Sequence, residues 1–137
     1  MNRLMRNLMF VALVGVLAAC GDDPTTPTDP TPAPTITETF SGTVTRNGAA
    51  THNFQSQASG TAAVTLTTLA PDSALVIGLS LGTWNGSACA LVITKDDATQ
   101  GSLVTGGVSS LGSLCVRIYD VGNITGPITY DITVVHP

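Results

Sequence analysis

A hydrolytic triad in this sequence would have to recruit one of its two histidines, His52 or His136. His52 shares strand parity with Phe54, which predicts a packed or edge position, and His136 lies one residue from the last position, where we expect a frayed tail. The sequence contains no Gly-x-Ser-x-Gly motif, phosphate-binding loop or His-Glu-x-x-His motif. We therefore expect no enzyme activity and no catalytic residues.

The acidic residues show no spacing typical of a metal site. Calcium needs about six to eight oxygen atoms that converge on one point, and the sequence gives no sign that Asp72, Asp96, Asp97 and Asp120 converge. We expect Asp96 and Asp97 to be solvated in a loop, and Asp120 and Asn123 to bond their own backbone in a turn. The sequence thus predicts no metal ligands and no cofactor.

Trp84 is the only tryptophan, and we expect it in a loop. An exposed indole there would stack on a sugar ring. The alternative is that Trp84 covers the end of the core beside Cys89. On the first interpretation, Trp84 is the candidate ligand contact.

The N-terminal residues have the pattern of an export signal. Arg3 and Arg6 precede an apolar run over 8–19 that is too short for a membrane span of about 20 residues. The sequence of 17–20, Leu-Ala-Ala-Cys, resembles a bacterial lipobox, which implies a cleaved signal peptide over 1–19 and a lipid on Cys20. Gly21 follows the cysteine where an inner-membrane retention signal has an aspartate, so the resemblance implies the outer membrane.

With Cys20 assigned to lipid, the pair Cys89 and Cys115 remains, and an exported domain favours a disulfide. A closed loop of about 27 residues would stabilise the fold by about 3–4 kcal/mol. Cys115 shares parity with Arg117 and Tyr119, which places the bridge at a sheet surface or edge.

The chain divides into a tether and one domain. Residues 20–37 hold the predicted lipidated cysteine and a Pro/Thr-rich tether with five of the eight prolines, which favours an extended backbone. Residues 38–137 alternate in polarity between turn residues, which predicts an all-β antiparallel β-sandwich, jelly-roll-like, with about eight strands. We predict strands at 39–45, 50–57, 61–68, 74–82, 88–94, 101–105, 113–120 and 127–135.

Two segments near the end of the sequence, 114–123 (LCVRIYDVGN) and 128–134 (ITYDITV), resemble the final hairpin of bacterial pre-peptidase C-terminal (PPC-like) domains. Upstream, 52–55 (HNFQ) and 59–66 (SGTAAVTL) are similar to the opening of that family. The resemblance covers about 38–137 and implies a non-catalytic β-sandwich that serves secretion or binding. On that hairpin, Arg117 and Asp131 would share an outward face and pair. The family's acidic loop is missing, since 72–79 reads DSALVIGL.

The charge of the chain limits its partners. Five basic against nine acidic side chains give a net charge of −4, which excludes a phosphate-neutralising nucleic-acid binder. We expect a non-catalytic lipoprotein of the bacterial cell envelope, held at the membrane by the lipid on Cys20, with a binding or accessory module for a polysaccharide or an envelope protein. The alternatives are a purely structural envelope component, or a calcium- or carbohydrate-binding module.

Overall fold

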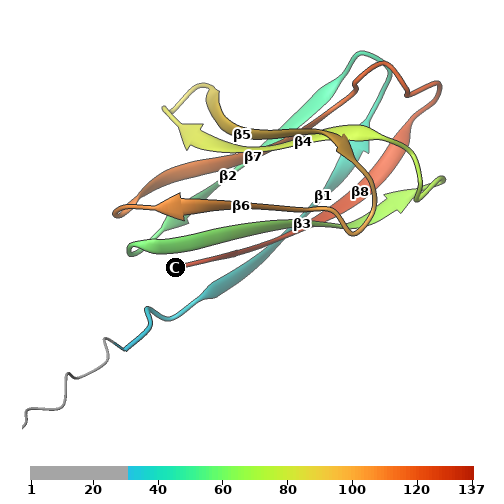
Figure 1. The fold of residues 1–137 in the computed structure, drawn as a ribbon. Coiled ribbons are helices and arrows are strands. Elements are labelled where there is room, and N and C mark those ends of the chain that lie inside the picture. The colour runs from blue at the N-terminus through green and yellow to red at the C-terminus, as the bar shows by residue number, and fades with distance from the viewer. Residues whose placement is uncertain (1–30) are drawn as a thin grey trace, which may run out of the picture. The chain divides into compact units, whose positions relative to one another are not determined.

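The computed structural model of the chain describes residues 31–137. The regular secondary structure of this part of the chain consists of β-strands (Figure 1). The strands are β1 (Ile36–Val44), β2 (Ala49–Ser56), β3 (Gly60–Ala70), β4 (Ile77–Trp84), β5 (Cys89–Ala98), β6 (Leu103–Val108), β7 (Gly112–Tyr119) and β8 (Ile128–His136). This part of the chain has no helix able to cross a membrane. The predicted signal peptide, Cys20 and most of the tether lie outside the described residues.

The strands form two antiparallel sheets of four, which pack face to face as a β-sandwich (Figure 1). The first sheet has the order β1-β8-β3-β6 and the second the order β2-β7-β4-β5. The pairs β1/β8, β2/β7, β3/β6 and β4/β5 are nested, so only β4 and β5 form a hairpin, and every other connection passes from one sheet to the other. This order is that of a jelly roll, and the predicted fold class is confirmed.

The core lies between the sheets because apolar residues alternate along each strand. In β3, Ala62, Val64 and Leu66 are fully buried, as the alternation of the sequence predicts. From β4, Ile77 and Leu79 meet them from the facing sheet. The remaining buried apolar positions include Val44, Phe54, Leu81, Val104, Val116, Ile118, Tyr130, Ile132 and Val134.

Both histidines lie between the two sheets. The His52 ring stacks on Phe40, with 4.9 Å between centroids, and its Nε2 atom is 2.7 Å from the Tyr130 hydroxyl. Burial lowers the pKa of His52. His136 is fully buried in β8, packs 4.8 Å from the Phe54 ring, and donates from Nε2 to a Glu38 carboxylate oxygen at 2.9 Å. The predicted packed position of His52 is confirmed, whereas the prediction of a frayed tail at His136 is wrong.

The final hairpin that the resemblance implies is not present. β7 pairs with β2 and β4, whereas β8 pairs with β1 and β3, so the two strands belong to different sheets. The expected pair of Arg117 with Asp131 is therefore wrong, and Asp131 accepts from the Ser41 hydroxyl at 2.5 Å. Asp120 explains the change of sheet, because its carboxylate accepts backbone N–H groups of 122–124 and turns the chain away from β7.

Candidate functional site

Small residues occupy the outer face of β4, a central strand of the second sheet. Gly78, Ser80 and Gly82 point outward, while Ile77 and Leu79 point into the core. Although β4 faces solvent on this side, Ser80 has no exposed surface, because groups from neighbouring strands cover it. The outer face of this sheet is therefore built by the side chains and backbone that lie across β4.

The Tyr119 ring covers Gly78, its partner across the β4–β7 pair. A Cβ at Gly78 would lie 2.1, 2.3 and 2.5 Å from three consecutive ring atoms, an approach that only a ring face allows. The Tyr119 hydroxyl donates to Asp96 on β5. Burial, with this hydrogen bond, raises the pKa of Tyr119 to about 12. The ring is thus held flat on the sheet as a protonated phenol.

The predicted disulfide joins Cys89 and Cys115, with an S–S length of 2.03 Å. Their Cα atoms are only 5.8 Å apart, although β4 lies between β5 and β7 in the sheet. Neighbouring strands lie about 4.8 Å apart, so the start of β5 must fold across β4 to reach β7. Gly82 allows this, since a Cβ there would lie 2.2 Å from the Ala90 carbonyl oxygen.

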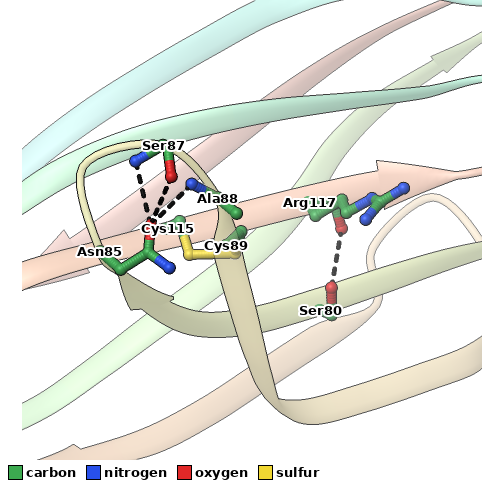
Figure 2. The surroundings of a disulfide bond; sticks show 7 residues. All are labelled: Ser80, Asn85, Ser87, Ala88, Cys89, Cys115 and Arg117. Carbon is green, nitrogen blue, oxygen red and sulfur yellow. Dashed lines mark hydrogen bonds between the residues drawn. A yellow bond between two sulfur atoms is a disulfide. The ribbon is translucent and has the colours of Figure 1, made fainter.

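Figure 2 shows the disulfide next to the turn of the β4–β5 hairpin. In that turn the Asn85 side chain accepts from the backbone N–H groups of Ser87 and Ala88 at 3.0 and 2.8 Å. Cys115 has no exposed surface, even though it points to the outer face, because β5 covers it. The bridge therefore lies at a sheet surface, as its parity predicts, but beneath a strand.

Arg117 lies on β7 between Cys115 and Tyr119, at the unblocked middle of this face. Its backbone oxygen accepts from the Ser80 hydroxyl at 3.3 Å (Figure 2). Within residues 31–137 the ion pairs are Lys95 with Asp97 and His136 with Glu38, so Arg117 has no carboxylate partner there. Its Nε atom is buried without a hydrogen-bond partner.

Arg117 and Tyr119 line an open hollow of about 340 Å³ on this face. The other lining residues come from the β1–β2 turn, β5 and the residue after β7: Asn47, Gly48, Ala49, Leu91 and Asp120. The wall is mixed in character, with a cation, an aromatic ring, a carboxylate and exposed backbone. Such a mixture suits a polar ligand that also has an apolar surface.

Asp120 fixes the rim of this hollow. Its Oδ2 atom accepts from the Asn47 N–H at 2.8 Å, and its own N–H donates to the Gly48 carbonyl at 3.0 Å. The Asn47 N–H and those of Ile124, Gly122 and Asn123 hold the pKa of Asp120 below its usual value. Asn47 has a positive φ of 56°, which the turn requires. The predicted backbone bonding of Asp120 is confirmed, and it positions the turn. For Asn123 the prediction is wrong, because its side chain donates to the Val76 carbonyl at 3.0 Å.

Two further hollows are smaller and have other characters. One, of about 110 Å³, lies between the sheets at the open edge, and its lining includes Leu81, Ile93, Gly106 and Val108. The other, of about 210 Å³, lies between the β3–β4 and β7–β8 connections and includes Asp72 and Asn123 in its lining. Neither histidine lines any of the three hollows.

Trp84, the predicted ligand contact, is the last residue of β4 and not a loop residue. It pairs with Cys89, is half-buried and lines none of the three hollows. Sequence reasoning missed Arg117 as a site residue, although its outward parity with Tyr119 beside a strand of small residues was a usable signal. The stacking role of Trp84 stays a prediction.

The acidic residues are dispersed and already bonded to protein donors. Asp96 accepts from Tyr119, Asp97 pairs with Lys95 at 2.8 Å, and Asp72 accepts from the Ala74 N–H at 2.9 Å. Asp96 and Asp97 belong to β5, so their expected place in a loop is wrong. The described part of the chain has no group of three or more His, Cys, Asp or Glu placed to hold a metal ion.

Comparison with family models finds no match for this chain, and comparison with curated proteins finds none either. The resemblance to PPC-like domains thus keeps the status of a prediction from the sequence. The jelly-roll order of the strands and the hollow around Arg117 are the features on which a functional argument can rest.

Proposed function

We propose that the protein is a lipid-anchored, non-catalytic binding module of the bacterial cell envelope. The lipobox-like segment 17–20 supports the anchor, and the Pro/Thr-rich segment before β1 supports a tether that holds the domain away from the membrane. Two or three acyl chains would give stable attachment, whereas one would not. On this proposal the jelly roll is the part that meets a partner, and the outer membrane is its location.

The observation that carries the binding role is Arg117. The Arg117 guanidinium has a buried Nε atom without a hydrogen-bond partner and no carboxylate partner in the described chain. Burial of such a group lowers the stability of the fold unless another interaction compensates for it. It borders the largest of the three hollows, on a face that the disulfide and the Tyr119–Asp96 bond make rigid. A rigid polar hollow with an unpaired donor group favours a binding role over a purely structural one.

The anchor is tested by expression of the full chain in a bacterium fed labelled palmitate. We expect the label on the wild-type protein and its recovery with the membrane fraction. The Cys20→Ala variant should carry no label and leave the outer-membrane fraction, while Cys115→Ala should still be labelled. A wild-type chain without label, or a labelled Cys20→Ala chain, contradicts the anchor.

The binding role is tested by photo-crosslinking in the native envelope. A photo-reactive residue at Thr51, which is exposed and pairs with Arg117, should crosslink to an envelope component. Its matched control is Thr129, equally exposed on the outer face of the first sheet. Equal crosslinking at both positions, or none at either, would contradict a binding face and favour the purely structural component.

A further inference from the structure

We propose that the hollow around Arg117 binds a saccharide unit that carries a carboxylate, a residue of the uronic-acid class. In this arrangement the guanidinium of Arg117 pairs with the carboxylate, and the flat Tyr119 ring receives the apolar C–H face of the sugar. The inference rests on the proposed binding role and names the ligand chemistry of that same face. Three features of the described residues carry it: the cation Arg117, the fixed ring of Tyr119, and nearby carboxylates that are bonded elsewhere.

The one cation that lines the hollow, Arg117, favours an anionic group in the ligand. Of the three basic side chains within residues 31–137, Lys95 is paired with Asp97, and Arg46 and Arg117 have no ion pair. Arg117 is the one of the three that lines the hollow. A guanidinium presents a planar fork of N–H donors that matches a carboxylate in two hydrogen bonds. Since the Nε atom is buried, the carboxylate would accept from the two Nη groups of the guanidinium.

The ring of Tyr119 selects a flat apolar face next to that anion. One side of the ring lies on Gly78, and its hydroxyl is held by Asp96, so the ring cannot turn away. Tyr119 lines the hollow together with Arg117, its neighbour on the same face of β7. A ring fixed before binding loses little conformational freedom when a sugar stacks on it. A simple anion such as phosphate makes no use of this surface.

The carboxylates near the hollow do not compete for Arg117. Asp120 accepts backbone N–H groups from Asn47 and from 122–124, and Asp96 accepts from Tyr119. Their charges are thus stabilised within the fold and leave the guanidinium available. The volume, about 340 Å³, lies in the range of small-molecule sites, about 300–1,000 Å³.

The experiment is a titration of the isotope-labelled, purified protein, followed by amide NMR shifts. The probes are trigalacturonate, its methyl ester, and the neutral galactose trimer of the same linkage. We expect trigalacturonate to shift amides of Gly48, Ala49 and Tyr119 in a saturable way. The ester and the neutral trimer should bind at least about tenfold more weakly, because each lacks the partner of a charge-assisted hydrogen bond.

Variants then assign the contacts. Arg117→Gln should weaken trigalacturonate binding by about tenfold to about a hundredfold, while Lys95→Gln, which removes the same charge from the same sheet, should leave it unchanged. Tyr119→Phe keeps the ring face and should stay within about threefold of the wild type. Trp84→Ala should have no effect. If Arg117→Gln fails to fold, the affinities of the wild-type protein for trigalacturonate and for its methyl ester still test whether the carboxylate is recognised.

The proposal is overturned if the ester binds as well as the acid, if Arg117→Gln binds normally, or if shifts gather at Trp84. Equal affinity for inorganic phosphate or for a peptide carboxylate also overturns it, since neither offers a sugar face. Absence of all saccharide binding, together with crosslinking at Thr51 but not at Thr129, removes this inference and leaves the proposed binding role standing. Absence of both removes both.

Discussion

The two outer faces of the sandwich differ, although each belongs to a four-stranded antiparallel sheet. On the first sheet, threonines face one another across the strands: Thr39 and Thr65 both pair with Thr133, and Thr43 pairs with Thr129. Side chains of similar size give an even, solvated surface, for which β-branched residues are well suited. None of the three hollows lies on that surface.

The second sheet has an uneven surface because its central strand β4 carries small residues on the outer face. Gly78 admits the face of the Tyr119 ring, and Gly82 admits the backbone of β5. Large groups thus lie flat on either end of β4, and Arg117 is left between them at the hollow. The difference shows that a hollow on a sheet face arises from small residues next to large ones, and not from strand order.

Loss of the disulfide should have the largest effect, since it holds β5 across β4. The double variant Cys89→Ala/Cys115→Ala should lower the free energy of unfolding by about 3–4 kcal/mol. Urea denaturation, read by the fluorescence of Trp84, measures this change. Reduction of the wild-type protein should give a similar loss, and an unfolding free energy within error of the wild type would show that the covered face does not need the bridge.

Gly78→Ala should rank second, because its Cβ meets the Tyr119 ring face within 2.1–2.5 Å. Overpacking of this kind costs about 1–3 kcal/mol. The matched control is Gly107→Ala on β6 of the other sheet, where a Cβ meets nothing within 4 Å and where we expect no loss. Equal stabilities of the two variants in thermal unfolding would remove the contrast between the faces.

The Tyr119 phenol should make the second face sensitive to alkali. Since the folded state holds the pKa of Tyr119 at about 12, above its ordinary 10.0, the contribution of this group to stability is present below pH 10 and is lost as the pH rises toward 12. Unfolding in urea at several pH values measures the loss. In Tyr119→Phe the loss of unfolding free energy at high pH should be smaller. The contribution of Tyr130 should remain, because burial raises the pKa of that tyrosine as well.

A threonine on the first face should matter least. Thr133→Ala removes cross-strand contacts with Thr39 and Thr65 on a solvated surface, for which we expect a change of about 0.5 kcal/mol or less. The same denaturation series reports it. A loss as large as that of Gly78→Ala would mean that the threonine surface also carries specific packing.

All eight strands could be predicted because each has its own alternation, and errors arise where a side chain changes a boundary. β4 begins at Ile77 and not earlier, since Asp72 holds the backbone of Ala74 and Leu75 in a turn. β5 continues through its charged end because Asp96 is bonded to Tyr119. Neither bond is visible in the local pattern.

The pairing of strands and the hollow were harder to predict. Residues 113–120 and 127–135 are neighbours in sequence, and nothing local distinguishes a hairpin from a passage to the other sheet. The outward parity of Cys115, Arg117 and Tyr119 was readable from the sequence, and so was the disulfide. The hollow also needs the β1–β2 turn and the fold of β5 over β4, which bring together residues far apart in the chain.

The nested order of the strands also governs how the chain can fold. The pair β1/β8 joins residues far apart in the sequence, for example Ser41 and Asp131, which are 90 positions apart. Domains built on such non-local contacts fold slowly, over milliseconds to seconds, and expose strand edges meanwhile. When the chain is synthesised or exported from its N-terminus, β1 has no neighbouring strand to pair with until β8 is available. Within the described residues, the β4–β5 hairpin is the one pairing of consecutive strands, so it can form early. The first sheet therefore cannot be completed before β8 is available to pair with β1 and β3.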